Sequence, residues 1–331
     1  MTPTATAFSD IDVGRRFPAR SWLVDDAGLD AGLDEYEQWH EWFAFADGAG
    51  RRLVPPVMLA SPSVAANPYD FLGIAAGTES HSTGLVYAGE PYSITVSADE
   101  KYVKRGLRYV WFKAEWTDSA GTLVHVYRWL QVVSLLARST DADRPAPRDI
   151  TGLAAEDLDQ HPYVPPLVSP RAEADWARPP EPFDGYLPAT ATVGYPLAPE
   201  ATRFSWRRAR DYAEYAARRT GLSRAYAAYN HHSHDDAARE RGLPGGVVSA
   251  INLDSVLATM LQRALGTDWL RSGRLRCRYL RTVAFTDFFV AKARLVAIDG
   301  PALTFDVWAE NQRGETVLGG TADVLRTAGT P

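Results

Sequence analysis

Apolar and polar residues alternate most clearly in two stretches, one near the end of each half of the chain. Residues 107–118 read LRYVWFKAEWTD, pass through a turn at Gly121 and continue as TLVHVYRWLQVV. Residues 303–311 read LTFDVWAEN, pass through a turn at Gly314 and continue as ETVLGGTADVL. A strand, a polar turn with glycine and a second strand form the pattern of a β-hairpin. The sequence therefore predicts a hairpin at the end of each half, with further strands in 84–97, 274–283 and 289–298.

A helical period marks residues 247–265. At about 100° per residue, its polar side chains fall on one side and its leucines on the other, but Asp254 lies inside the apolar arc. A buried carboxylate must be hydrogen-bonded or protonated, so Asp254 is a candidate functional group. The matching first-half segment, 53–66, carries three prolines, and Pro62 is expected to interrupt a helix there. Further helical stretches are expected near 27–43 and at 205–219.

The order of elements repeats. Residues 140–190 hold 10 of the 22 prolines and show little periodicity, which is typical of a linker. We therefore divide the chain into a first unit at 1–140, a linker at 141–186 and a second unit at 187–331. Each unit has helical segments followed by antiparallel strands, which predicts an α+β fold built twice, with the two sheets paired edge to edge.

Composition narrows the class of protein. The 331 residues are 46% apolar and 23% charged, which favours a packed core over disorder. A net charge of −6 argues against a general nucleic-acid binder. The single cysteine, Cys277, excludes an intramolecular disulfide and fits a reducing compartment. With no signal-peptide pattern and no apolar run of about 18 residues, we expect a soluble cytoplasmic protein with no membrane or nucleic-acid partner.

Polar chemistry gathers in residues 229–249, YNHHSHDDAARERGLPGGVVS, just before the long helix. The stretch contains three of the seven histidines, His231, His232 and His234, followed directly by Asp235 and Asp236. A loop can aim such side chains while the packed helix behind it holds the loop in place. We expect the candidate site here.

The same stretch resembles the hydratase segment of the MaoC-like family in Asn230-x-His232, Ala238-Arg239 and Gly242-Leu243-Pro244-Gly245. The resemblance covers nearly the whole chain. It implies a double hot-dog fold, that is, two helix-wrapped antiparallel sheets in one chain, and activity as an enoyl-thioester hydratase or 3-hydroxyacyl-thioester dehydratase. It further implies that the first unit carries no catalytic motif. Two aspartates of the family motif are replaced in this chain, the first by Ala227 and the last by His234.

The resemblance assigns the role of catalytic base to His232, whose unperturbed pKa of about 6.5 suits that role. The acid stays open among Asp235, Asp236, Asp254 and His234. The backbone N–H groups of Gly245, Gly246 and Val247 are expected to bind an enolate-like oxygen, and Tyr229 and Asn230 are further candidate substrate contacts. Structural readings compete with these: Asp235 or Asp236 can cap a short helix, His231 can be a surface residue, and His232 and Asp254 can be structural.

Two other patterns bear on ligands. His232, His234 and Asp236 alternate as zinc ligands can, but no further ligand cluster stands out, so we expect neither metal nor cofactor. In the strand at 274–281, Arg274, Arg276 and Arg278 share one face. They are candidates for binding the phosphates of coenzyme A or of an acyl-carrier-protein arm; the alternative is a solvated strand face.

The sequence thus favours a hydratase or dehydratase acting on an acyl-CoA or acyl-carrier-protein thioester, as a monomeric pseudo-dimer or a homodimer. Three alternatives stay open. One is a hot-dog thioesterase with Asp254 at its centre. Another is a biosynthetic lyase or cyclase, and the last is a catalytically degenerate partner that binds acyl thioesters.

Overall fold

The fold is described here from a computed structural model. The residues that the structure describes are 8–36, 41–44, 46–69, 73–133, 185–204, 231–232, 235–239, 243–285 and 287–327. The predicted helix at 205–219 and almost all of the predicted linker lie outside them. Within the described residues, no helix is both long and apolar enough to cross a membrane.

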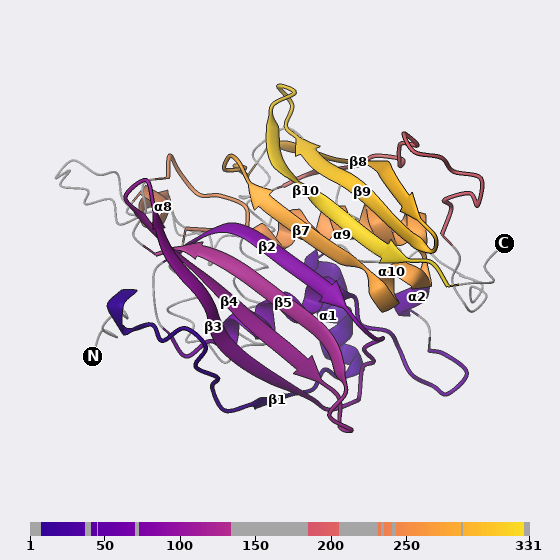
Figure 1. The fold of residues 1–331 in the computed structure, drawn as a ribbon, viewed down its shortest axis with the longest axis horizontal. Helices are drawn as coiled ribbons and strands as arrows, with labels where there is room; N and C mark the ends of the chain where they lie inside the picture. Colours follow the sequence, from indigo (N-terminus) through magenta and orange to yellow (C-terminus); the bar gives the residue numbers. More distant parts are fainter. Residues whose placement is uncertain are drawn as a thin grey trace.

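Ten strands form one antiparallel sheet in the order β1-β3-β4-β5-β2-β7-β10-β9-β8-β6 (Figure 1). The first half supplies β1 (Arg20–Trp22), β2 (Ile74–Ser82), β3 (Tyr92–Lys104), β4 (Leu107–Thr117) and β5 (Leu123–Val132). The second half supplies β6 (Glu200–Arg203), β7 (Arg274–Tyr279), β8 (Phe288–Asp299), β9 (Ala302–Glu310) and β10 (Thr316–Leu325). Counted inward from its outer edge, each half uses its first, third, fourth, fifth and second strand, so the two halves repeat one topology.

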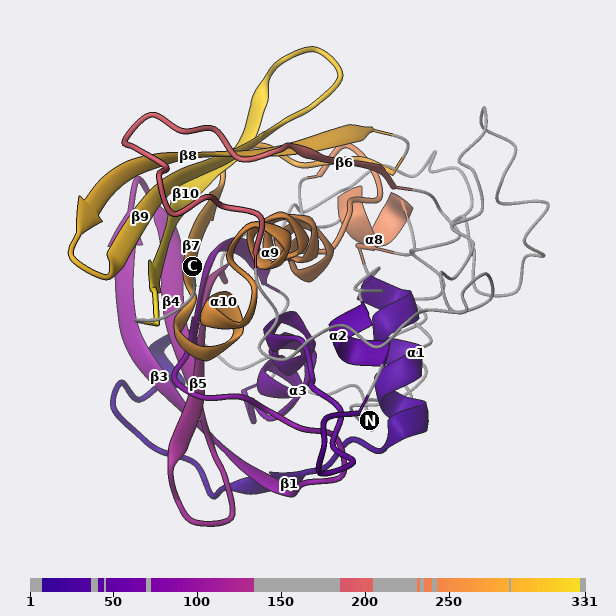
Figure 2. The same ribbon diagram turned by 90° about the vertical axis from the view of Figure 1, so that its right-hand side faces the viewer.

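The helices lie mainly on the concave side of the sheet. Figure 2 shows the sheet curving around α3, α9 and α10, with α1 and α2 farther from it. The helical segments are η1 (Phe8–Asp10), α1 (Asp26–Tyr36), α2 (Glu41–Ala44), η2 (Pro56–Leu59), α3 (Ala60–Ala65), α8 (Asp235–Arg239), α9 (Ala250–Leu265) and α10 (Thr267–Ser272). Helix α9 occupies the centre of the second half because its leucines are buried against the sheet, Leu257 and Leu261 completely. This is the α+β double hot-dog arrangement that the sequence predicts.

The two halves meet at β2 and β7, which pair from Gly77↔Arg278 to His81↔Arg274. Gly77 permits the close approach: a Cβ there would lie 2.7 Å from the backbone oxygen of Cys277. One hydrophobic core runs through both halves, from Trp116 in the first to Phe305 in the second. The edge-to-edge pairing of two sheets, expected from the repeat, is confirmed.

The segments before the two central helices also match. Leu53 forms a β-bridge with Tyr87, and Val247 forms the equivalent bridge with Ala284. The next amide in each half, Val54 or Val248, donates to a carbonyl just before the bridge partner. The two central helices then differ in length: α3 has 6 residues and α9 has 16.

Most predicted elements are present. The two hairpins are β4–β5 and β9–β10, and the long helix is α9. The expected interruption at Pro62 was wrong, because Pro62 lies in the first turn of α3, where no intrahelical N–H bond is lost. In the run 84–97, the strand begins only at Tyr92. Strand β2 was missed altogether.

Candidate functional site

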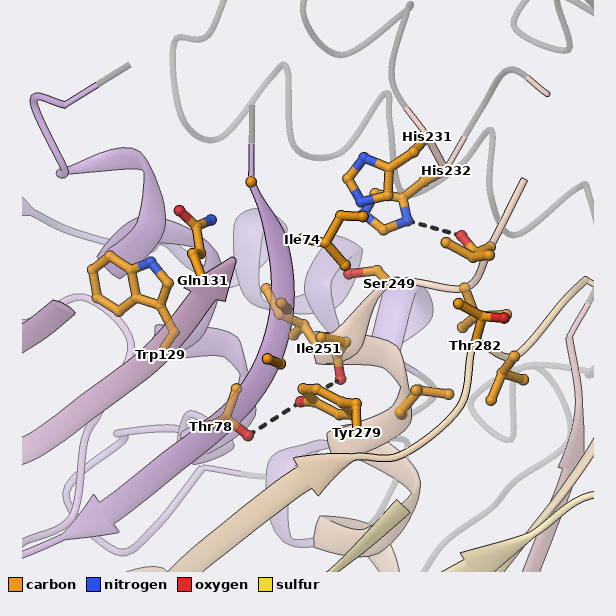
Figure 3. Close-up of a pocket in the computed structure, with 18 of the residues that line it drawn as sticks. Ile74, Thr78, Trp129, Gln131, His231, His232, Ser249, Ile251, Tyr279 and Thr282 are labelled. Carbon is orange, nitrogen blue, oxygen red and sulfur yellow. Dashed lines mark hydrogen bonds between the residues drawn. The ribbon is translucent and has the colours of Figure 1, made fainter. Parts of the chain in front are cut away.

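A pocket of about 390 Å³ opens where the two halves meet (Figure 3). The first half contributes residues from α3, β2 and β5, and the second contributes His231, His232, the start of α9 and the segment after β7. Most of the lining is apolar, with side chains such as Val64, Ile74 and Val283. Polar side chains interrupt it, among them His231, His232, Thr78, Tyr279, Trp129 and Gln131. An apolar pocket with a few convergent polar groups is the usual form of a small-molecule site.

His232 is held in one tautomer by the backbone. Its Nδ1 lies 2.8 Å from the carbonyl oxygen of Val247, and the Val247 N–H donates back to the carbonyl of His231 at 3.0 Å. Because a carbonyl oxygen can only accept, Nδ1 carries the proton and the lone pair is at Nε2. Burial lowers the pKa of His232 to about 4, although the bond to Val247 acts to raise it. The imidazole is therefore neutral at physiological pH and able to accept a proton.

His231 lies beside His232, with the ring centroids 3.9 Å apart. It is half-buried and lines the pocket, which favours a place in the site over the reading as a surface residue. Its Nδ1 is buried and has no hydrogen-bond partner within the described chain. His231 thus presents a second imidazole to the same cavity.

Asp235 and Asp236 have structural partners. Both lie in the first turn of α8. The Asp235 carboxylate accepts the N–H of Gly246 at 2.8 Å, and buried Asp236 pairs with Arg239 at 3.0 Å. Neither carboxylate lines the pocket. Their positions therefore favour the structural reading, and Asp236 is not placed to act as the catalytic acid.

The same contacts correct the expected oxyanion donors. The N–H of Gly246 is used by Asp235 and the N–H of Val247 by His231, so neither is available to a ligand. Helix α9 starts three residues after Val247, with Leu253 making the first intrahelical bond to Ser249. The amides of Ala250 and Ile251 therefore have no intrahelical acceptor. Both residues line the pocket, where the helix dipole adds partial positive charge.

Asp254 lies one turn deeper on α9 and binds two hydroxyl groups from different halves. Its carboxylate accepts from Thr78 Oγ1 of β2 at 2.7 Å and from Tyr279 Oη of β7 at 2.9 Å. Burial raises the pKa of Asp254 to about 6, although both hydrogen bonds act to lower it. Thr78 and Tyr279 line the pocket, and Figure 3 shows their side chains there. Asp254 does not line it, so the carboxyl group is connected to the cavity through these two hydroxyls.

The three arginines of β7 face away from the pocket. Arg274 pairs with Glu79 at 3.4 Å, Arg276 pairs with Asp323, and the Arg278 guanidinium lies 4.7 Å from the ring centroid of Trp111. Strand alternation puts Leu275, Cys277 and Tyr279 on the inner face, so the arginines lie on the outer one. None of the three lines the pocket, where the described lining includes one cationic side chain, Arg281. Binding of carrier phosphates by the β7 arginines stays a prediction.

Tyr229, Asn230 and His234 lie outside the described residues, and Gly245 lies beside Asp235 but does not line the pocket. Among the residues that are described, no three His, Cys, Asp or Glu side chains gather as metal ligands.

Sequence reasoning missed Thr78, Tyr279, Trp129 and Gln131. The signal for Tyr279 was present, because it shares the inward face of β7 with Leu275 and Cys277. Trp129 and Gln131 fall on one face of a strand that was predicted correctly. Thr78 lies on the strand that was not recognised, so nothing local pointed to it.

Comparisons with known proteins bear on the fold. No family model matches the chain, and no curated protein sequence matches it. A solved MaoC-like dehydratase is similar, with a TM-score of 0.70 and 16% identity over 97% of this chain and 100% of that one. So is a putative MaoC domain protein dehydratase from Chloroflexus aurantiacus J-10-fl, with a TM-score of 0.63 and 15% identity over 98% of both chains. A conserved hypothetical protein from Mycobacterium tuberculosis with a double hot-dog fold gives 0.58 and 13% over 97% of this chain and 98% of its own. The predicted double hot-dog fold is therefore confirmed.

Proposed function

We propose that this protein is a hydro-lyase that adds water to, or removes it from, the β-carbon of an acyl thioester. One observation carries the proposal: three kinds of group meet at one apolar pocket. They are the neutral His232, the uncapped start of α9, and a hydroxyl that is hydrogen-bonded to Asp254, a carboxyl group with a raised pKa. Loss of water next to a thioester carbonyl needs a base, an oxyanion site and an acid. The MaoC-like fold supports the same class by analogy.

His232 is the proposed base. In the dehydration direction, Nε2 takes the proton from Cα of a 3-hydroxyacyl thioester, and the electron pair moves toward the thioester carbonyl. The amides of Ala250 and Ile251 stabilise the enolate-like oxygen that results, because they are pre-oriented at a helix start. The low pKa of His232 keeps it ready to accept a proton above about pH 4.

Asp254 is the proposed proton source, acting through Tyr279. The leaving β-hydroxyl takes the phenolic proton of Tyr279, and Tyr279 takes a proton from the Asp254 carboxyl group, so that water leaves without charge. Asp254 then regains a proton and His232 loses one, which restores both groups. A carboxyl pKa of about 6 makes this exchange possible near neutral pH.

The acyl part of the substrate fits the pocket, and the carrier does not. A volume of about 390 Å³ suits an acyl group of moderate size but not a whole coenzyme A. The carrier, coenzyme A or an acyl-carrier-protein arm, therefore extends past exposed Arg281, which offers a charge to a phosphate. The first-half and second-half sides of the pocket both belong to one protein chain, so the proposed site needs no second copy of the protein.

The test uses purified protein and a panel of enoyl and 3-hydroxyacyl thioesters on coenzyme A. Hydro-lyase activity interconverts the two classes with no release of free thiol. Release of thiol would instead identify a thioesterase, the role in which Asp254 would have to attack the substrate. Tight binding without either reaction would identify an acyl-thioester-binding partner protein. Either of these last two results would overturn the proposal.

A further inference from the structure

The first-half side of the pocket contains two polar atoms with no hydrogen-bond partner in the part of the chain that the structure describes. Trp129 Nε1 and Gln131 Oε1 are both buried, and neither has a hydrogen-bond partner within the described chain. The two residues lie two apart on β5, so their side chains are on the same face of the strand. Both line the pocket, and Figure 3 shows them next to each other, on the other side of Ile74 from the two histidines.

A buried N–H group without a hydrogen-bond acceptor lowers the free energy of unfolding. A buried indole N–H that has no acceptor therefore points to a role other than stabilising the fold. The same half of the molecule shows the normal solution: buried Trp116 donates its Nε1 proton to Ser63 Oγ at 2.8 Å. Trp129 is also buried, with 2% of its surface exposed, yet its Nε1 has no such acceptor among the residues that the structure describes. The difference between the two indoles is that only Trp129 lines the cavity.

The chemistry of a fitting ligand follows from the two groups. Trp129 can only donate, and the carbonyl end of Gln131 can only accept. A hydrocarbon chain would cover both atoms and leave both unpaired. A hydroxyl group satisfies both at once, because it accepts from the indole and donates to the amide. The Gln131 side chain is only partly buried and can rotate to meet the ligand.

We propose that the preferred acyl group carries a second hydroxyl, distant from the thioester, which binds Trp129 and Gln131. The proposal rests on the proposed function for the thioester end of the substrate. His232 and the start of α9 lie on the second-half wall, whereas Trp129 and Gln131 lie on the first-half wall. The reacting carbons and the second hydroxyl are therefore at opposite sides of the cavity. The substrate class is a hydroxylated acyl thioester rather than a plain fatty acyl thioester.

The experiment measures binding by calorimetry, with saturated pantetheine thioethers that can be neither hydrated nor cleaved. Chains of equal length are compared with and without a hydroxyl at successive positions from the fourth carbon onward. We expect at least one hydroxylated chain to bind about tenfold tighter than its plain counterpart. Trp129→Phe should reduce that preference to near unity, because it removes the N–H and keeps an aromatic ring.

Trp116→Phe is the matched control: it also removes a buried indole N–H from the first half, but away from the pocket, and should keep the preference. If Trp129→Phe does not fold, Gln131→Leu tests the same site from the accepting side. The inference is overturned if no hydroxylated chain is preferred, or if the preference survives in the variants of Trp129 and Gln131. If all acyl chains bind equally and the protein still shows hydro-lyase turnover, the preference for a second hydroxyl is refuted and the proposed function is not. Selective binding without turnover supports it and refutes the proposed function.

Discussion

The two halves of this molecule share one topology, but the segments just before their central helices use polar groups in different ways. Before the short helix of the first half, the guanidinium of Arg52 donates to the carbonyl of Phe43 and pairs with Asp26 and Asp30, at 3.2 and 2.8 Å. The equivalent position of the second half, placed by the matching bridges, is Gly246. There the side chain is missing, the amide binds Asp235, and His232 lines the pocket close by.

This difference distinguishes polar side chains that hold the fold together from the polar side chains of the proposed site. Every hydrogen bond described for the Arg52 side chain ends on an oxygen of the first half, so this side chain holds segments of its own half together. In the second half, burial leaves His232 neutral and raises the pKa of Asp254, and these two groups lie at the pocket or hydrogen-bond to residues that line it. A repeated scaffold thus lets one half be compared directly with the other, and substitutions on each side should have different consequences.

The largest effect is expected for His232→Ala. Removing the base should lower kcat/KM by about 10²–10⁴-fold. Stability should change little, by about 1 kcal/mol, because one hydrogen bond to Val247 is lost. Steady-state kinetics and urea unfolding measure the two quantities. His81→Ala, a histidine of the first half outside the pocket, is the control and should keep full activity.

Asp254→Asn should lower the rate by about 100-fold and change the pH profile. In the proposed mechanism, dehydration needs neutral His232 and protonated Asp254. The rate therefore falls as pH drops below about 4 and also as pH rises above about 6. The amide cannot exchange a proton, so the fall above pH 6 should disappear. An unchanged alkaline limb in the Asn variant would remove Asp254 from the mechanism.

Arg52→Leu should show the opposite split to His232→Ala. Removing the guanidinium leaves Asp26, Asp30 and the Phe43 carbonyl without their shared donor, and we expect a loss of about 2 kcal/mol in the free energy of unfolding. The estimate is modest because both carboxylates keep contact with water. Activity per folded molecule should stay within about twofold of wild type. Chemical unfolding with parallel assays checks both; strong inactivation of the folded variant would contradict the comparison.

The smallest effect is expected for Thr78→Val, which tests the contribution of the first half to the acid. The hydrogen bond that the Thr78 hydroxyl donates lowers the pKa of Asp254, so removing it should raise that pKa. The alkaline limb of the rate profile should then move to higher pH, with a change of only a few-fold at the optimum. Ser82→Ala removes a hydroxyl of the same strand whose described partner is His125 and not Asp254, and it should leave the limb in place.

Periodicity predicted the fold well wherever one face of an element is continuous and apolar. The β4–β5 and β9–β10 hairpins and helix α9 belong to this class. Strand β2, IAAGTESHS, does not: its inward face carries Thr78, Ser80 and Ser82, whose hydroxyls bind Asp254 and His125. A strand whose core-facing positions are hydroxyls has no hydrophobic alternation to detect.

The site was predicted only in part, because some of its residues stand out only once the strands are paired. The loop histidines and Asp254 stood out as unusual residues in their local context. Tyr279 and Thr78 look ordinary in the sequence and gain importance only because β2 and β7 pair, which brings residues 201 positions apart into contact. The arginines of β7 are a further example. The sequence correctly predicted that they share one face of the strand, but whether that face turns toward the pocket depends on the strands that pair with β7.

The pocket lies across the β2–β7 seam, and this placement makes ligand binding and folding one equilibrium. A molecule bound there touches both halves and acts as a removable cross-link between them. Its binding free energy adds to that of folding by mass action, about 2.7 kcal/mol when the free ligand is at 100 times its dissociation constant. The midpoint of a thermal unfolding curve therefore reports occupancy, and ranking acyl compounds by the midpoint they produce would identify the preferred ligand without any assay of turnover.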